Sequence, residues 1–257
     1  MDIEHFTLEV DHGVAVVTLD RPPVNAQDRR TREELIWIID SLSDRDDVRA
    51  VILTGAGKVF SAGADLGERA KLADVPGEYL RHNRIVRESF FVLTDCAKPV
   101  IAAINGPAIG AGFALAASCD ILVCSDNAYI QMPEVDLAMA GGAKFLTRHL
   151  PRSASRLLFF TGRRMYAPDM YRHGLVEAVV PRDDLLPTAL ELAGEIARKS
   201  PLAVAKNKAA FNVVEGLTDR EGYRYEQGLT RELSTSSDAL EARTAFLEKR
   251  DPRFTGR

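Results

Sequence analysis

The sequence predicts an α/β fold, in which short buried strands alternate with helices in a layered core. Three stretches lead to this prediction. Residues 31–43 repeat apolar side chains at helical spacing, and residues 48–57, VRAVILTGAG, form a β-branched run that ends in glycines. Residues 99–126 read as strand, turn, helix and strand in succession. With 257 residues, of which 46% are hydrophobic and 27% charged, the chain is long enough for one large domain with a sizeable core.

The first third of the chain begins this alternation. Residues 14–26, VAVVTLDRPPVNA, read as a strand that ends in a turn at Arg21-Pro22-Pro23. The helix over residues 31–43 has one apolar face, formed by Leu35, Ile38, Ile39 and Leu42. The strand over residues 48–57 follows and enters a loop. Residues 68–94 are charged and helical, with a break at Pro76-Gly77.

The most apolar stretch, residues 100–119, contains no charged side chain and is long enough to cross a bilayer. Asn105-Gly106-Pro107 lies near its middle and would break a spanning helix there. We therefore interpret the stretch as a buried strand, a turn and an alanine-rich helix, followed by another strand at residues 120–126. No membrane span is predicted.

Composition excludes several classes of function. The net charge is −4, the pI is near 5.8, and the 33 Lys and Arg are scattered among 37 acidic residues, so no nucleic-acid partner is expected. The N-terminus, MDIEHFTLEVDHG, lacks the basic start and apolar run of a secretory signal, which indicates a cytoplasmic protein. Cys96, Cys119 and Cys124 form no C-x-x-C motif, so we expect buried thiols rather than disulfides or a zinc site.

Common catalytic and nucleotide-binding motifs are absent from the sequence. The third glycine of a G-x-G-x-x-G motif would fall at Phe60, and Ser61 lacks the upstream glycine of G-x-S-x-G. The histidines show no metal-ligand spacing such as H-E-x-x-H, so no metal is predicted. We expect each histidine to be solvated or structural: His5, His12, His82, His149 and His173.

Two glycine-rich turns are candidate ligand sites. One is GKVFSAGADL, residues 57–66, and the other is the start of the alanine-rich helix at residues 110–112. Small residues let a ligand oxygen approach unpaired backbone N–H groups, so each turn could hold an anion or oxyanion. The alternative is that both are merely close-packed turns.

Four segments resemble, in order, the signatures of the crotonase, or enoyl-CoA hydratase/isomerase, family. They are GKVFSAGADL, KPVIAAINGPAIGAGFALAASCDI, MPEVDLAMAGG and AFLEKRDPRFTGR. The resemblance implies a crotonase-like spiral of repeated β-β-α units that binds acyl-CoA over residues 1–199, and a helical trimerisation region over residues 200–257. It also implies an acyl-CoA thioester substrate, a homotrimer or dimer of trimers, and no cofactor, since coenzyme A is part of the substrate.

The resemblance also implies a set of binding residues. The thioester carbonyl would lie between the backbone N–H groups of Ala64 and Ala111, which would stabilise an enolate, and Ala111 stands where the family usually has glycine. The residues expected to contact CoA are Ala62, Ala64, Asp65 and Leu66, with Phe246 and Lys249 closing on it from a neighbouring subunit.

Other family features are weaker in this chain. Pro23 and Gly67 stand where family members often place lysines for the CoA phosphates, which leaves Lys58 as a weaker phosphate candidate. The walls of the acyl pocket are expected from residues 68–94 and from the C-terminal helices.

The catalytic acids decide which reaction the resemblance implies. Hydratases of this family use two glutamates, of which the second matches Glu134, in an apolar run where burial should raise a carboxyl pKa. The first matches Ala114, which cannot transfer a proton. Asp136 would share a face with Glu134 if the chain stayed extended, as an auxiliary acid. One carboxylate beside an oxyanion hole suits isomerisation of 3-enoyl-CoA to 2-enoyl-CoA better than hydration.

Two alternatives stay open. The segments TGRRM and EKRDPRFTGR resemble carnitinyl-CoA dehydratase-like members, which favours an enoyl-CoA hydratase or a related hydro-lyase that adds or removes water. The loss of one glutamate also suits a non-catalytic acyl-CoA-binding protein that has kept the fold.

Overall fold

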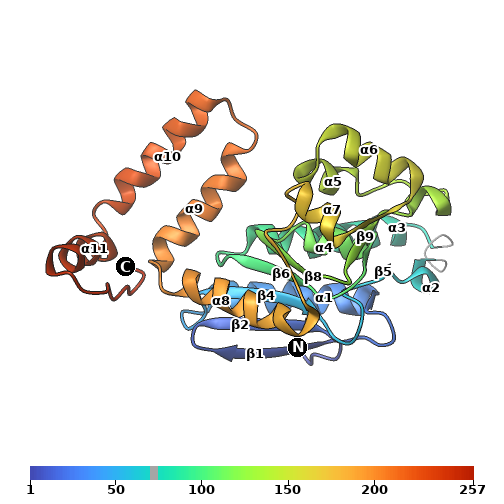
Figure 1. The fold of residues 1–257 in the computed structure, drawn as a ribbon, viewed down its shortest axis with the longest axis horizontal. Helices are drawn as coiled ribbons and strands as arrows, with labels where there is room; N and C mark the ends of the chain where they lie inside the picture. Colours follow the sequence, from blue (N-terminus) through green and yellow to red (C-terminus); the bar gives the residue numbers. More distant parts are fainter. Residues whose placement is uncertain (70–74) are drawn as a thin grey trace.

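The computed structural model describes residues 1–69 and 75–257, and its centre is a six-stranded sheet with the order β1-β2-β4-β6-β8-β11 (Figure 1). β1 and β2 pair antiparallel, and every other neighbouring pair runs parallel. The strands are β1 (Phe6–Asp11), β2 (Val14–Leu19), β4 (Ala50–Gly55), β6 (Val100–Ile104), β8 (Ile121–Ser125) and β11 (Ala178–Val180). The predicted α/β fold is confirmed.

Two smaller sheets lie beside the central one, with the orders β10-β9-β7 and β3-β5. Their strands are β3 (Ala26–Gln27), β5 (Gly63–Ala64), β7 (Ala108–Ile109), β9 (Tyr129–Gln131) and β10 (Arg164–Tyr166). The helices between β9 and the C-terminal region are η1 (Glu134–Leu137), α5 (Ala143–His149), α6 (Arg152–Thr161), α7 (Ala167–Arg172), η2 (Arg182–Asp184) and α8 (Leu185–Ala197).

Both faces of the central sheet are covered, which explains why its parallel strands are almost continuously apolar. α8 lies along one face, where Ala189 packs in the same cluster as Ile52 of β4 (Figure 1). The other face of β4 contributes Val51 and Leu53 to a larger cluster beneath α1 (Arg29–Asp44). Successive residues of β4 therefore alternate between the two clusters.

α1 confirms the amphipathic helix predicted over residues 31–43. Its predicted apolar face is fully buried, with Leu35, Ile38, Ile39 and Leu42 at most 1% exposed. The helix begins after Asp28, whose carboxylate accepts a hydrogen bond from the Thr31 N–H at 2.8 Å.

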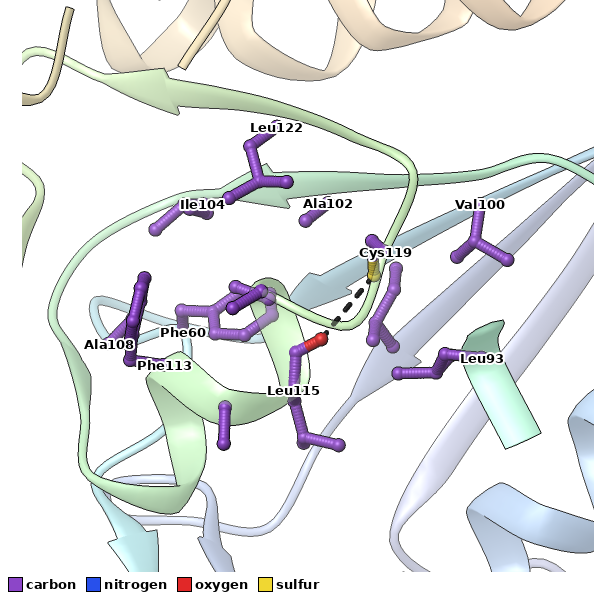
Figure 2. Close-up of a cluster of buried hydrophobic side chains, with 14 of the residues drawn as sticks. Phe60, Leu93, Val100, Ala102, Ile104, Ala108, Phe113, Leu115, Cys119 and Leu122 are labelled. Atoms are coloured by element: carbon purple, nitrogen blue, oxygen red, sulfur yellow. Dashed lines mark hydrogen bonds between the residues drawn. The ribbon is translucent and has the colours of Figure 1, made fainter. Parts of the chain in front are cut away.

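The strand, turn, helix and strand predicted over residues 99–126 are present as β6, a bend, α4 (Ala111–Ala116) and β8. Figure 2 shows Phe60, Phe113 and Leu122 in the buried cluster that joins α4 to these strands. α4 ends earlier than the alanine-rich run, because the Asp120 N–H already bonds to the Val100 carbonyl where β8 begins beside β6. Within residues 1–69 and 75–257, no helix is long and apolar enough to cross a membrane.

The charged segment over residues 68–94 is divided as predicted. α2 (Leu66–Arg69) overlaps its first two residues, α3 (Glu78–Asp95) covers the part after the break, and residues 70–74 lie outside the described residues. The predicted break at Pro76-Gly77 is observed, since Gly77 precedes α3 with a φ of 85°, a conformation that favours glycine.

Three helices at the C-terminus extend away from the central sheet (Figure 1): α9 (Pro201–Val214), α10 (Asp219–Leu233) and α11 (Ser237–Glu248). Several large apolar side chains on them are exposed, with Phe211 at 73%, Phe246 at 83% and Leu247 at 80%. The division of the chain at residues 199 and 200 stays a prediction.

A buried lysine ties α9 to the core. Lys208 Nζ lies 2.8 Å from Asp120 Oδ2 and donates to the carbonyls of Leu93 and Lys98 at 2.9 and 3.0 Å. These carbonyls lie near the end of α3 and just before β6, so one side chain fixes the middle of α9 to two elements of the core.

The cysteines are free and buried, as predicted: Cys96, Cys119 and Cys124. Burial raises the pKa of the Cys124 thiol to about 12, so it stays protonated. His149 is structural, as predicted, because its buried Nε2 lies 2.9 Å from the Ala117 carbonyl oxygen.

Candidate active site

A cavity of about 450 Å³ lies where β5, α3, the start of α4 and η1 meet. Among the residues predicted from the sequence, the cavity is lined by Ala62, Ala64, Leu66, Ala111, Ala114 and Glu134. In the described part of the chain, no residue of α9, α10 or α11 lines it. The C-terminal helices were expected to form part of the wall of the acyl pocket, and within one chain they do not.

Two glycine-rich segments run side by side at the base of the cavity. Ser61 and Ala108 form a parallel bridge, and the Ile109 N–H donates to the Ser61 carbonyl at 3.0 Å. Beyond this bridge the segments stay close, since a Cβ at Gly63, the neighbour of Ala64, would lie 3.2 Å from the Ala111 nitrogen. The two alanines predicted as a pair are thus neighbours in space.

The close approach of the two segments depends on glycines. A Cβ at Gly63 would lie 2.5 Å from the Ile109 carbonyl oxygen and 3.2 Å from the Ala111 nitrogen. A Cβ at Gly112 would lie 2.2 Å from the Ser61 carbonyl oxygen. Both turns are close-packed, and the packing is what brings their backbones together.

Ala64 and Ala111 both line the cavity. The segment of Ala64 is anchored to the chain around β3 on either side, since the Ala62 N–H donates to the Val24 carbonyl at 3.0 Å and the Asp65 N–H to the Gln27 carbonyl at 2.9 Å. Ala111 is the first residue of α4, whose first turn leaves its N–H groups without intrahelical partners.

Glu134 lines the same cavity as these two alanines. It is the first residue of η1, and a Cβ at Gly110 would lie 3.0 Å from its Oε1. The Oε2 atom is shielded from solvent. Gly110 has a φ of 53°, a conformation that favours glycine, and a larger residue would meet the carboxylate. The carboxylate thus lies one residue away from the Ala111 donor.

Asp136 does not join Glu134, contrary to the expectation from an extended chain. The chain forms the 3-10 helix η1 after Pro133, so residues two apart point in different directions. A Cβ at Gly162 would lie 2.6 Å from Asp136 Oδ2, which shows that this carboxylate faces the end of α6. Asp136 does not line the cavity, and the auxiliary acid is a wrong prediction.

Ala114 lies one turn after Ala111 on α4 and is 3% exposed. It lines the cavity at the position where the resemblance places the missing glutamate. Among the cavity-lining residues in the described ranges, Glu134 is the single carboxylate.

The residues predicted to contact CoA divide into two groups. Ala62 and Leu66 lie at the cavity, whereas the Asp65 carboxylate accepts a bond from Arg21 Nη2 at 2.9 Å and caps α2 through the Gly67 N–H. The bond from Arg21 lowers the pKa of Asp65. Asp65 therefore holds the segment in place through its side chain.

The remaining candidates lie away from the cavity of their own chain. Phe246 and Lys249 are exposed and belong to the end of α11, which Figure 1 shows far from α4. Lys58 is also exposed and does not line the cavity, although its carbonyl packs closely against Gly106.

The structure adds polar residues that the sequence interpretation missed. His82, expected to be solvated or structural, is 7% exposed and lines the cavity. Arg32 on α1 is 2% exposed and lines it as well, and burial lowers the pKa of its guanidinium against the opposing effect of Glu68. The sequence held a signal for Arg32, since helical spacing puts it on the buried face with Leu35 and Ile39.

Comparisons with known proteins show the family of the chain. The model of the enoyl-CoA hydratase/isomerase family matches residues 9–257. A carnitinyl-CoA dehydratase of Citrobacter koseri is 38% identical, and the alignment covers 98% of both chains. A (7aS)-7a-methyl-1,5-dioxo-2,3,5,6,7,7a-hexahydro-1H-indene-carboxyl-CoA hydrolase of Rhodococcus jostii is 36% identical over 94% of this chain and 93% of that protein. The crystal structure of an enoyl-CoA hydratase from Bacillus anthracis is similar with a TM-score of 0.93 and 34% identity, covering 99% of this chain and 100% of the other.

Proposed function

The chain belongs to the enoyl-CoA hydratase/isomerase family, and from this premise we propose that it transfers a proton on an acyl-CoA thioester, converting 3-enoyl-CoA to 2-enoyl-CoA. The crotonase-like fold predicted from the four signatures is confirmed. The observation that carries the proposal is the position of the Glu134 carboxylate against Gly110, in the cavity that Ala64 and Ala111 also line.

The reaction needs one base and one oxyanion site. The thioester oxygen accepts hydrogen bonds from the Ala64 and Ala111 N–H groups. Glu134 removes a proton from C2, and the electron pair of the broken C–H bond moves into an enolate on that oxygen. The resulting carboxylic acid then donates the proton to C4, while the double bond shifts from C3–C4 to C2–C3. Atoms and charge balance without water.

The oxyanion site supplies a large part of the rate. The donors are held by the backbone of β5 and α4 before substrate arrives, so they need no reorganisation when charge develops on the oxygen. In other enzymes, loss of one such donor costs about 3 to 4 kcal/mol of transition-state stabilisation. Since only its N–H takes part, Ala111 can fill a position where the family usually has glycine.

In this proposal coenzyme A contacts the segment formed by Ala62, Ala64, Asp65 and Leu66. The bond between Asp65 and Arg21 holds this segment in position. Phe246 and Lys249 reach the site of a neighbouring subunit in a homotrimer or dimer of trimers. The exposure of Phe246 and its distance from its own cavity support this assignment. Light scattering of the purified protein checks the assembly, and a fully active monomer would contradict it.

Addition or removal of water is a second candidate function. Relatives 36–40% identical to this chain include several named carnitinyl-CoA dehydratase. His82 lines the same cavity as Glu134, and an imidazole could protonate a leaving hydroxyl group in place of the glutamate that Ala114 replaces.

The products formed from a 3-enoyl-CoA in D2O distinguish these functions. Mass spectrometry follows deuterium and water uptake, and ultraviolet absorbance follows conjugation. The proposal predicts a conjugated product with no added water, which contains deuterium wherever the Glu134 carboxylic acid exchanges its proton with D2O before donating to C4. A water adduct would favour the second candidate, and a bound but unchanged substrate would favour a protein that only binds acyl-CoA.

Ala114→Glu tests whether the missing carboxylate limits hydration. We expect this variant to gain water addition, because the new carboxylate would enter the cavity that holds Glu134. Ala114→Gln is the matched control, since it has the same size without the charge. Efficient hydration by the unsubstituted protein would show that the argument from one carboxylate is wrong.

A further inference from the structure

We propose that the acyl group of the substrate carries, besides the thioester oxygen, an oxygen atom that accepts hydrogen bonds from Arg32. The inference rests on the proposed function, because it assigns the substrate class of the same cavity. Arg32 lies on α1 and lines the cavity that contains Glu134.

Arg32 has donors that the protein does not use. Its Nη1 donates to Glu68 Oε2 at 3.2 Å. Its Nε and Nη2 atoms are shielded from solvent and have no hydrogen-bond partner among residues 1–69 and 75–257. Buried donors are almost always paired, because an unmet donor has lost its bonds to water without replacement. Two unmet donors on a side chain at the wall of a binding cavity indicate that the ligand supplies the acceptor.

The neighbouring carboxylates are already engaged. Asp28 and Asp65 both bind Arg21 Nη2, at 3.0 and 2.9 Å. The other oxygen of Glu68 accepts from the Arg29 N–H at 2.9 Å. Because Glu68 already opposes the charge of Arg32, a neutral hydroxyl or ketone oxygen on the acyl group is sufficient to satisfy the remaining donors.

The wall of the cavity near α3 is polar as well. Tyr79, His82 and Asn83 line it from the first turns of α3, ahead of the apolar Val86 and Phe90. A plain alkyl chain lying against this wall would displace water from polar groups without replacing its hydrogen bonds, which costs free energy. An oxygenated chain would replace some of those bonds.

The same argument disfavours an acyl group that carries a quaternary ammonium, as a carnitinyl group does. The ammonium end of such a group has no atom that accepts a hydrogen bond, and its positive charge would be repelled by the guanidinium. The oxygen that bonds to Arg32 is therefore expected on an acyl group without a cationic end.

Equilibrium binding of saturated acyl-CoAs tests the inference without depending on turnover. Isothermal titration calorimetry compares hexanoyl-CoA with 5-oxohexanoyl-CoA, 6-hydroxyhexanoyl-CoA, adipoyl-CoA and 6-trimethylammoniohexanoyl-CoA. We expect the best oxygenated ligand to bind about ten- to a hundredfold more tightly than hexanoyl-CoA, the range for a hydrogen bond to a charged group. The trimethylammonio ligand should bind more weakly than hexanoyl-CoA. Tighter adipoyl-CoA binding would identify a carboxylate oxygen, and tighter oxo or hydroxy binding a neutral one.

Variants of Arg32 assign the preference to its donors. In Arg32→Met, the ratio between the affinity for the best oxygenated ligand and the affinity for hexanoyl-CoA should fall close to one. Arg32→Lys keeps a positive charge opposite Glu68 but lacks the Nε and Nη2 donors, so it should also lose the preference for oxygenated ligands. If Arg32→Met fails to fold, Arg32→Lys provides the same test. Arg81→Met is the matched control, because Arg81 lies on α3 and is exposed outside the cavity, and it should keep the ratio.

Two results would overturn the inference: equal binding of oxygenated and plain ligands by the unsubstituted protein, or an unchanged ratio in both Arg32 variants. Deuterium exchange at C2, measured separately, tests the proposed function. Neither exchange nor conjugation of a 3-enoyl-CoA, together with a preference that depends on Arg32, would refute the function and leave the inference standing. Exchange at C2 without a preference for oxygenated ligands would support the proposed function and overturn the inference about Arg32.

Discussion

In Gly112→Ala, at the centre of the proposed site, helix propensity and packing have opposite effects on stability. Gly112 is the second residue of α4, and alanine is a better helix former by about 1 kcal/mol. The added Cβ would lie 2.2 Å from the Ser61 carbonyl oxygen, however. An ordinary C···O contact begins at about 3.3 Å, so the segment containing Ser61 and the start of α4 must separate by roughly 1.1 Å.

This separation acts directly on the paired donors. The parallel register between Ser61 and Ala108 sets the position of Ala64 against Ala111, so a shift of roughly 1 Å moves one N–H away from the thioester oxygen. We expect C2 proton exchange to fall about a hundredfold, the cost of a misplacement of this size. Overpacking should also lower the free energy of unfolding by about 1 to 3 kcal/mol, which exceeds the gain in helix propensity.

Deuterium exchange at C2 of a bound acyl-CoA and urea unfolding measure the two effects. Gly194→Ala on α8 is the matched control, because its Cβ would meet only Arg198 Nη1 at 3.8 Å, an ordinary contact. This control should keep its exchange rate and gain stability. If Gly112→Ala also gained stability and exchanged at the unsubstituted rate, the argument from the close approach would be refuted.

Two further predictions concern stability. Lys208→Met should lower the free energy of unfolding by about 1 to 3 kcal/mol in urea denaturation, because it removes the charged donor from the Leu93 and Lys98 carbonyls, whereas the partly exposed Asp120 keeps its bond from the Val100 N–H; a loss below about 0.5 kcal/mol would contradict this role. For Asp238, burial opposes ionisation, but bonds from Ser200 and from the Thr255 and Gly256 N–H groups outweigh it and lower the pKa below 3.8. Because the folded pKa is depressed, this stabilisation is present above about pH 4 and is lost as pH falls through the folded pKa. Asp238→Asn should flatten that part of the acid-unfolding profile, and an unchanged profile would refute the assignment.

Local patterns were enough to predict the elements of the core. The face of α1 formed by Leu35, Ile38, Ile39 and Leu42, and the turn at Asn105-Gly106-Pro107, depend on neighbours in sequence and were predicted from them. The pairing of Ala64 with Ala111 depends on a register between segments 47 positions apart, as in the bridge from Ser61 to Ala108. No local pattern contains that information, and the family resemblance supplied it.

The acyl cavity was predicted less completely. Arg32 was passed over because arginine is normally exposed, although its spacing from Leu35 places it on the buried face. His82 shares the cavity-facing side of α3 with Val86 and Phe90, a pattern that is visible only once the start of α3 is known. Asp136 was misplaced because the turn after Pro133 is a 3-10 helix rather than an extended strand.

The central claim is that the Glu134 carboxylate moves the C2 proton. Its most direct test is the rate of deuterium exchange at C2 of a 3-enoyl-CoA in D2O, compared between Glu134→Gln and the control Asp136→Asn, which alters the carboxylate facing α6. We expect Asp136→Asn to exchange at the unsubstituted rate, and Glu134→Gln to bind acyl-CoA while its exchange falls by at least about a hundredfold. Exchange by Glu134→Gln at the unsubstituted rate would contradict the account.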